Sequence, residues 1–393
     1  MIFTDELIDS PGAVEGSEVR LSAAERKVMM GNQACAEGAL RAGCRFYAGY
    51  PITPSSEIME ELARRLPDAG GAFVQMEDEL GSIAAIVGAS WTGVKAMTAT
   101  SGPGLSLMME GLGYAAMTET PCLIVDIQRA GPCTGQATKV GSGDILQVRF
   151  GSHGDYCPVA LSPWSVQEMY DLTIQAFNLS ERFRVPAVLL AEEATGHLRE
   201  TVRLHDDFQL VERDRSPGRP PFGSDAADGV PPMPAFGDGA NLLVTGSTHD
   251  EWGFRRVDHP RVHRQLVERI NRKVLDHADE IAGFEEFFCD DAEVAVVAYG
   301  FTARAALAAV KRLRRENLPV GLLRLQTIWP APAARLRQLG RRVRAVLAPA
   351  MNLGQLAFYL RQHLSCPVEE LNQVSGTVIE PDTVAERLRE MLP

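Results

Sequence analysis

Three consecutive acids, Glu77, Asp78 and Glu79, stand where a short apolar segment gives way to a run of small residues. Bulkier apolar residues recur in that run at helical spacing, at Leu80, Ile83 and Val87, which predicts a helix that begins at the acids. The helix dipole favours acids in the first turn, and this explains Glu77 and Asp78. Glu79 directly precedes the apolar face, so we expect its side chain to be partly buried. A buried carboxyl without a partner shifts its pKa, which makes Glu79 the candidate acid or base.

A second candidate stretch follows the predicted strand 45–50. Residues 51–56 read Pro-Ile-Thr-Pro-Ser-Ser. The prolines keep this loop extended, and either serine can cap the helix that follows, so one interpretation is a rigid turn with a cap. That interpretation does not explain Tyr50 and Thr53. Both are displayed at the carboxyl end of a strand, where α/β proteins place ligands.

Two further motifs also follow predicted strands. Strand 94–100 runs into the tight turn Ser101–Gly104, and the buried strand 122–127 ends at Arg129 beside a Gly/Pro loop. Arg129 is either an ordinary surface residue or a carboxylate clamp, a role that suits its planar guanidinium fork. His153, in a glycine-rich loop, is either a proton carrier or a residue with structural hydrogen bonds.

Composition excludes several classes of protein. The 393 residues carry a net charge of -12, which argues against nucleic-acid and anionic-membrane surfaces as partners. No apolar run has the length of a membrane span, and no signal-peptide pattern is present. The seven cysteines include no Cys-x-x-Cys pair, so no iron–sulfur or zinc framework is indicated. Scattered single cysteines fit a reducing environment, and we expect a cytoplasmic protein.

Alternating strand and helix patterns position these motifs and predict an α/β fold with mainly parallel sheets. We expect an N-terminal arm over residues 1–26 and a first α/β domain over 27–200. A linker rich in Pro, Gly, Asp and Arg follows over 201–240, and a second α/β domain over 241–393.

The order of motifs in the first domain resembles the pyrimidine-binding domain of thiamine diphosphate enzymes. In that family an acid is followed by small residues, here Gly88-Ala89, then by a strand, a turn such as Ser101–Gly104, a helix and another strand. The second domain resembles the C-terminal domain of transketolase, which usually supports subunit contacts and carries no chemistry of its own. The resemblance therefore implies a thiamine diphosphate-binding fold followed by a transketolase C-terminal-like domain.

Taken together, residues 27–393 resemble the alpha subunit of 2-oxoacid:ferredoxin oxidoreductases. The motifs that carry this resemblance are Gly49–Ser56, Gln75–Glu79, Thr100–Gly104 and Gln128–Gly135. His249–Glu251 and Asn352–Leu356 are similar to the 2-oxoglutarate type. Members that use branched-chain 2-oxoacids are similar too, so the choice of substrate stays open.

The resemblance implies a role for each motif residue. Glu79 is expected to hydrogen-bond the aminopyrimidine ring of thiamine diphosphate. Arg129 and Thr53 are expected to hold the carboxylate or keto oxygen of the 2-oxoacid, and Tyr50 to form a wall of the pocket. The other residues expected to contact the cofactor are Pro51, Ile52 and Gly102.

The implied reaction is oxidative decarboxylation of a 2-oxoacid, with 2-oxoglutarate as the best candidate. Coenzyme A accepts the acyl group and ferredoxin the electrons. Thiamine enzymes hold Mg²⁺ and diphosphate with a Gly-Asp-Gly that follows a strand, but Gly237–Gly239 follows no predicted strand, and we interpret it as a turn. We therefore expect the cofactor to be shared with a beta-type subunit, and Mg²⁺ and 4Fe-4S clusters to lie on partner subunits. Gamma- and delta-type subunits complete the expected assembly.

Three alternatives remain at this point. The substrate is a branched-chain 2-oxoacid or pyruvate; or the chain is the beta subunit of the first enzyme of a 2-oxoacid dehydrogenase complex; or it is a non-catalytic scaffold subunit. The dehydrogenase subunit has the same domain order but passes the acyl group to lipoamide, so dependence on ferredoxin or lipoamide separates the two enzymes. Joint retention of Glu79, Thr53 and Arg129 argues against the scaffold.

Overall fold

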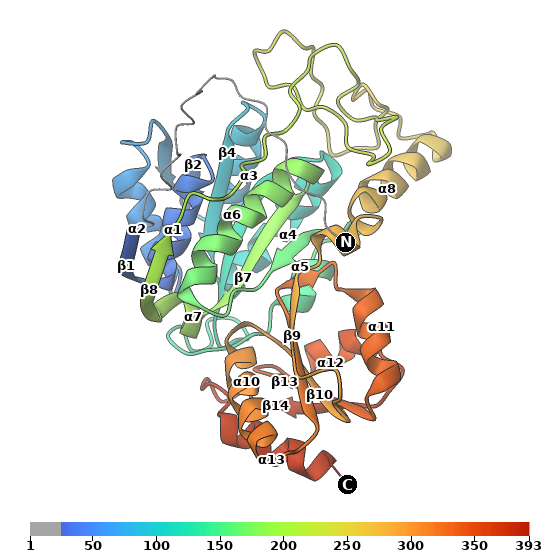
Figure 1. The fold of residues 1–393 in the computed structure, drawn as a ribbon. Helices are drawn as coiled ribbons and strands as arrows, with labels where there is room; N and C mark the ends of the chain where they lie inside the picture. The colour runs from blue at the N-terminus through green and yellow to red at the C-terminus, as the bar shows by residue number, and fades with distance from the viewer. Residues whose placement is uncertain (1–24, 393) are drawn as a thin grey trace, which may run out of the picture.

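The computed structural model describes residues 25–392 of the chain (Figure 1). The expected N-terminal arm therefore lies outside the described residues except for its last two, which begin a strand. The first elements are β1 (Glu25–Met30), α1 (Gly31–Arg41), β2 (Cys44–Gly49), α2 (Ser56–Arg65), β3 (Ala72–Gln75), α3 (Glu79–Ser90), β4 (Lys95–Thr100), α4 (Gly102–Met117), β5 (Cys122–Gln128), α5 (Ile145–Phe150), β6 (Val159–Leu161), α6 (Val166–Phe183), β7 (Pro186–Glu192), α7 (Glu193–His197) and β8 (Arg199–Leu204).

The remaining elements follow a long irregular segment, in which residues 205–259 form no helix or strand. They are α8 (Pro260–Leu275), α9 (Ala278–Ile281), β9 (Phe284–Phe287), β10 (Val294–Tyr299), α10 (Gly300–Arg315), β11 (Val320–Leu325), β12 (Thr327–Trp329), α11 (Ala333–Arg342), β13 (Ala345–Ala350), α12 (Gln355–Leu360), β14 (Val368–Asn372) and α13 (Pro381–Met391). None of the helices within residues 25–392 is long and apolar enough to cross a bilayer.

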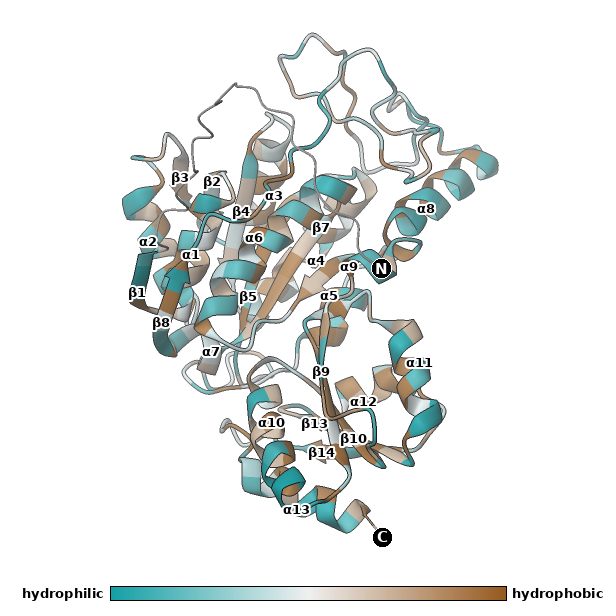
Figure 2. Cartoon of the chain, viewed as in Figure 1, coloured by the Kyte–Doolittle hydropathy of each residue, from teal (hydrophilic) through white to brown (hydrophobic). Residues whose placement is uncertain are grey.

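The first sheet has seven strands in the order β12-β6-β7-β5-β4-β2-β3, and all but β12 run parallel. Every residue of β4, β5 and β7 is buried, because helices cover both faces of the sheet. Helices α1, α2 and α6 pack on one face and α3 and α4 on the other. Figure 2 shows the hydrophobic residues along β7 that this arrangement buries. The predicted mainly parallel α/β fold is confirmed.

The second sheet has the order β14-β13-β10-β11-β9, with β9 antiparallel to β11. Helices α10 and α13 cover one face and α11 and α12 the other. The apolar cluster under α11 and α12 is continuous with the cluster under α3 and α4. The two α/β units therefore share one hydrophobic core.

One strand crosses between the two units. The sequence predicts that residues 326–330 merely end the strand before them. Instead, residues 327–329 form β12, which pairs antiparallel with β6 of the first sheet. The edge of β6 would otherwise lack a hydrogen-bonding partner, and β12 satisfies it. The domain limits at residues 200 and 240 stay a prediction.

A buried ion cluster fastens α8 to the first unit. Glu119 is fully buried, and its carboxylate accepts bonds of 2.6 and 2.7 Å from Arg269 and of 2.7 Å from Lys273. Burial alone would raise the pKa of Glu119, but these two cations lower it well below its usual range. Helix α8 thus depends on a carboxylate that comes from the turn after α4.

We expect Glu119→Gln to destabilise the fold by about 3–5 kcal/mol, because Arg269 and Lys273 would remain buried without a counter-charge. Denaturant unfolding followed by circular dichroism measures this loss. The control is Glu268→Gln, which removes the exposed pair with Arg264 and should leave the unfolding free energy nearly unchanged. Equal midpoints for the two variants would contradict a structural role for Glu119.

Candidate active site

The predicted motifs meet at one edge of the first sheet. Strands β5, β4, β2 and β3 are neighbours and parallel, so their carboxyl ends lie side by side. Arg129 follows β5, Ser101 follows β4, the loop at residues 50–55 follows β2, and the acids follow β3. The amide of Met76 donates to the carbonyl of Gly49 at 2.9 Å and holds the end of β3 against the end of β2. This edge is where open α/β sheets bind ligands.

Glu79 opens α3 and is only 5% exposed, as its place in the sequence predicts. Asp78 is the N-cap of this helix, and its carboxylate accepts from the amide of Gly81 at 2.7 Å. Burial and the charge of Asp78 raise the pKa of Glu79, and the Thr100 hydroxyl opposes that rise. No ion pair of the described residues involves Glu79. Glu79 is therefore a buried acid without a counter-charge.

Gly104 permits this placement of Glu79. A Cβ atom at residue 104 would lie 2.3 Å from Glu79 Oε1 and 2.1 Å from Thr100 Oγ1. Only glycine lets the start of α4 approach the carboxyl so closely. The turn at residues 101–104 is thus built around Glu79, a contact that spacing along the sequence cannot reveal.

The apolar face of α3 differs from the prediction at one residue. Ile83 and Val87 are buried as expected, but Leu80 is 51% exposed. Leu80 lies in the first turn and lines an apolar cavity of about 570 Å³ together with Trp91 and with Tyr114 of α4. Leu80 therefore faces this cavity and not the core.

The loop after β2 is held from behind. The Asn32 amide donates to the carbonyl of Pro54 at 2.8 Å and to Glu57 at 2.7 Å. Ser55 is the N-cap of α2, but its hydroxyl donates to the carbonyl of Ile52 and accepts nothing from the helix. The prediction of a side-chain cap is wrong here, because a helical backbone conformation at Ser55 favours the bond back into the loop.

Arg129 binds this same loop. It is 9% exposed, and its Nη1 donates to the carbonyl oxygen of Thr53 at 2.7 Å. Nε of Arg129 has no partner among the described residues. The structure thus brings together two residues 76 positions apart and places Arg129 in the wall of a cavity.

The other predicted residues lie along the same edge. Tyr50 is 40% exposed, Pro51 and Thr53 are exposed and Ile52 is half-buried. Gly102 begins α4 and lines a cavity of about 390 Å³ with Arg129 and Asp144. Residues 351–355 of the second unit complete its wall.

Two acids at this edge of the sheet were not predicted, and one of them, Asp144, lines the cavity. Asp126 lies inside β5 and is fully buried, and Asp144 precedes α5. An acid inside the otherwise apolar run 122–127 is the signal that could have singled out Asp126, because buried carboxyls are costly. Asp144 carries no such signal, since its burial arises from packing against Gly102.

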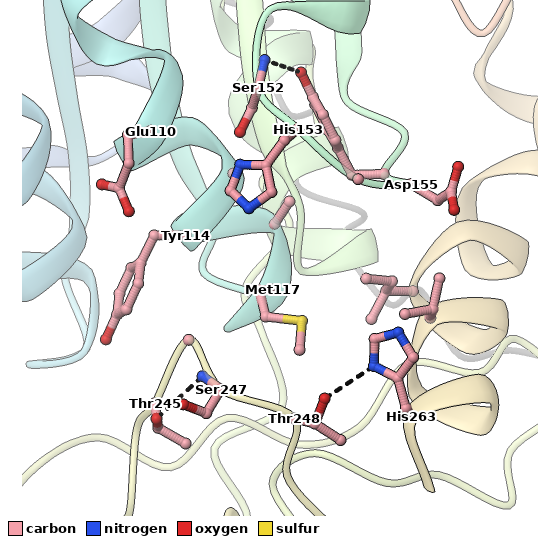
Figure 3. A pocket seen from close by; sticks show the side chains of 17 residues that line it. Glu110, Tyr114, Met117, Ser152, His153, Asp155, Thr245, Ser247, Thr248 and His263 are labelled. Atoms are coloured by element: carbon pink, nitrogen blue, oxygen red, sulfur yellow. Dashed lines mark hydrogen bonds between the residues drawn. The ribbon is translucent and has the colours of Figure 1, made fainter. Parts of the chain in front are cut away.

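His153 lies elsewhere. It is exposed and lines a different cavity of about 540 Å³ between α4, the loop at residues 151–156 and α8 (Figure 3). Figure 3 shows His153 on the same side of this cavity as Ser152, with Thr248 and His263 opposite. Oγ1 of Thr248 and Nδ1 of His263 lie 2.8 Å apart and share a hydrogen bond. His153 does not line the cavity of Arg129.

The described residues contain no group of three or more metal-ligating side chains. Gly237–Gly239 forms a turn, in which Asp238 accepts bonds of 2.6–3.0 Å from Arg215. Its carboxylate is thus already occupied by a cation from this chain.

Comparison with known proteins identifies the class. Residues 37–269 match the family described as pyruvate flavodoxin/ferredoxin oxidoreductase, thiamine diP-bdg. Residues 292–384 match pyruvate:ferredoxin oxidoreductase core domain II. The chain belongs to this oxidoreductase family, and its first unit is a thiamine diphosphate-binding domain.

Two relatives and one solved structure narrow the comparison. The 2-oxoglutarate synthase subunit KorA of Methanocaldococcus jannaschii is 50% identical over 90% of this chain and 96% of that protein. The ketoisovalerate oxidoreductase subunit VorB of Methanothermobacter thermautotrophicus is 37% identical over 93% of this chain and 97% of that protein. The solved 2-oxoglutarate:ferredoxin oxidoreductase from Magnetococcus marinus, with 2-oxoglutarate, coenzyme A and succinyl-CoA bound, gives a TM-score of 0.90 at 33% identity. That match covers 93% of this chain and 65% of the other.

These similarities confirm the alpha-type subunit that the sequence motifs predict. The chain is a subunit of an oxidoreductase that acts together with other subunits.

Gly104→Ala tests the packing around Glu79. The added methyl group would displace the carboxyl, so we expect the affinity of the assembled enzyme for thiamine diphosphate to fall roughly tenfold or more. Titration calorimetry of the cofactor-free enzyme measures this affinity. The control is Gly88→Ala in α3, where the new methyl group meets no atom within 4 Å and should change nothing. Equal affinities would mean that the carboxyl does not depend on Gly104.

Proposed function

We propose that this chain is the alpha subunit of a 2-oxoglutarate:ferredoxin oxidoreductase. The enzyme cleaves carbon dioxide from 2-oxoglutarate, transfers the remaining acyl group to coenzyme A as succinyl-CoA, and passes the two electrons to ferredoxin. The observation that carries the proposal is the meeting of Glu79, Thr53 and Arg129 at one sheet edge, in a chain 50% identical to a 2-oxoglutarate synthase subunit.

Glu79 is the residue assigned to the cofactor. The space over its carboxyl is kept open by Gly104, and the carboxyl has no cation beside it, so it fits a ring nitrogen that shares its proton. Burial raises the pKa of Glu79, so it holds this proton more readily than an exposed glutamate does. Thiamine diphosphate, when bound, supplies the carbanion chemistry that breaks the carbon–carboxylate bond. Pro51, Ile52 and Gly102 are assigned to the surface against which the cofactor rests.

Arg129 and Thr53 are assigned to the substrate. The guanidinium fork matches a carboxylate, and its bond to the Thr53 carbonyl fixes its direction. The Thr53 side chain, which is exposed at the same loop, is assigned to the keto oxygen. Tyr50 closes the pocket beside them and limits the access of water.

The remaining parts of the reaction are assigned to partner subunits. The described residues offer no metal-ligand cluster, so we place Mg²⁺ with the diphosphate on a beta-type subunit that shares the cofactor. The 4Fe-4S clusters lie on partner subunits as well, and gamma- and delta-type subunits and ferredoxin complete the assembly. A cytoplasmic location agrees with the seven cysteines, all of which are free thiols.

An anaerobic substrate panel tests the proposal. The complex that contains this chain is assayed for coenzyme-A-dependent viologen reduction with 2-oxoglutarate, 2-oxoisovalerate and pyruvate. We expect thiamine-dependent activity with 2-oxoglutarate and a kcat/KM at least about tenfold lower with the other two acids. Preference for 2-oxoisovalerate would support the branched-chain alternative, and activity with lipoamide in place of viologen would support the dehydrogenase.

The matched control for this panel is the complex with Glu79→Gln. The amide is isosteric with the carboxyl, so the fold and assembly should persist while turnover falls by a factor of about 10²–10⁴. Full activity in this variant would remove the role assigned to Glu79. An inactive wild-type complex with intact clusters would favour the scaffold alternative.

Arg129→Ala should raise the KM for 2-oxoglutarate about 10- to 100-fold, because a charged hydrogen bond contributes about 1.5–3 kcal/mol. The effect on kcat should be smaller, since the role assigned to Arg129 is to bind the charge of the substrate and it transfers no proton. Steady-state kinetics separate the two constants. Arg149→Ala serves as the control, because Arg149 lies in α5, donates to the carbonyl of Tyr156 and does not line the cavity of Arg129. An unchanged KM in Arg129→Ala would make Arg129 a purely structural residue.

A further inference from the structure

Asp126, which is buried, and Asp144, which is half-buried and lines the cavity, form a pair of carboxyls beside Arg129. Asp126 is fully buried, and neither of its carboxylate oxygens meets a hydrogen-bond donor from the described residues. Oδ2 of Asp144 is also without a donor. The two carboxyls face each other, and their contact becomes a hydrogen bond only when one of them carries a proton.

Two such carboxyls cannot both be ionised without a large cost. Burial, and then the charge of Asp144, raise the pKa of Asp126 well above its usual range. Burial raises the pKa of Asp144 to about 6, and the bond to Asp126 and the charge of Arg129 oppose that rise. The pair therefore holds one shared proton, and with it a single negative charge, to higher pH than exposed carboxyls would.

The neighbouring elements leave Arg129 as the cation that faces this pair. Gly102, at the start of α4, packs against Asp144 and contributes no charge. A Cβ atom added at Gly102 would lie 3.1 Å from Oδ2 of Asp144. From β5, Gln128 accepts from the amide of Asp144 at 3.2 Å. From β10, Tyr299 donates to the carbonyl of Ser142, and burial raises its pKa so far that it stays neutral.

Glu192, at the carboxyl end of the adjacent strand β7, is the other buried acid of this region. It turns toward the second unit, where its Oε2 accepts from the amide of Phe301 at 3.2 Å. Burial raises the pKa of Glu192 to about 8. The titration of Glu192 must therefore be distinguished from that of the pair by experiment.

The second unit fixes the loop that carries Asp144. Asn352 donates to the carbonyl of Ser142 at 2.7 Å, and Gln355 donates to that of Gly143 at 2.6 Å. The amide of Leu146 donates back to Gln355 at 3.3 Å. Asp144 consequently cannot turn away from Asp126 when the pair changes its charge.

We propose that Asp126 and Asp144 are positioning residues for the substrate carboxylate: their shared proton limits the negative charge beside Arg129, and its loss at alkaline pH weakens binding of the 2-oxoacid. The inference rests on the proposed function, because it takes Arg129 as the binding group. It adds a pH-dependent control of affinity that leaves the chemical step alone.

The test is the pH dependence of kcat and KM for 2-oxoglutarate in the assembled enzyme. In the wild type we expect KM to rise roughly tenfold on going from neutral to alkaline pH, the effect of one added charge near the substrate, with little change in kcat. In Asp126→Asn the amide donates to Asp144 permanently, so KM should stay near its neutral-pH value throughout. Asp144→Asn should give the same flat profile if the first variant fails to fold.

Glu192→Gln is the matched control, since it removes a buried acid on the neighbouring strand and should retain the alkaline rise in KM. A rise in Asp126→Asn and Asp144→Asn equal to that of the wild type would overturn the inference, and so would a flat wild-type profile. If Glu192→Gln were the only variant with a flat KM profile, the alkaline rise in KM would arise from Glu192, and the inference would be overturned as well.

Infrared difference spectroscopy tests the shared proton without turnover. The wild type minus Asp126→Asn spectrum at neutral pH should contain the C=O stretch of one protonated carboxyl, which disappears at alkaline pH. Its absence would overturn the inference. If the stretch is present but the wild type oxidises no 2-oxoacid, the proposed function fails and the proton-sharing pair stands.

Discussion

The parallel register of β5, β4, β2 and β3 is the constraint on which the rest of the site depends. Each strand is fixed to its neighbours by backbone hydrogen bonds that cannot be left unmade in a buried sheet. Their carboxyl ends therefore meet at one edge, whatever the lengths of the connections. This is how Thr53 and Arg129 reach each other, and how the turn at residues 101–104 reaches Glu79.

The second α/β unit contributes to this edge although the resemblance to transketolase implies no chemistry for it. β12 extends the first sheet, and one apolar cluster runs through both units. Arg324, buried in the second unit, pairs with Glu168 of the first. Asn352 and Gln355 then hold the loop that carries Asp144, so the packing between the units determines the geometry next to Arg129.

The buried acids of the chain have different roles because different groups surround them. Glu119 meets Arg269 and Lys273, its pKa falls, and its role is to hold α8 in place. Glu79 meets no cation of the described chain, its pKa rises, and it is available for a proton. The pair of Asp126 and Asp144 lacks even a hydrogen-bond donor from the described residues, so it retains a proton of its own. Buried carboxyl groups thus serve three purposes in this chain, and the charges around each group determine its purpose.

Sequence patterns alone predict the α/β fold, the family and the motifs that meet at the site. Those features rest on short-range patterns: apolar periodicity marked α3, and turn residues marked the ends of β2, β4 and β5. Only the tertiary structure decided which atoms touch. The contact of Gly104 with Glu79, the bond of Arg129 to Thr53 and the pairing of β12 with β6 join residues far apart in the chain. So does the meeting of Asp126 with Asp144, because burial and the loss of solvation arise from packing and leave no pattern between neighbouring residues.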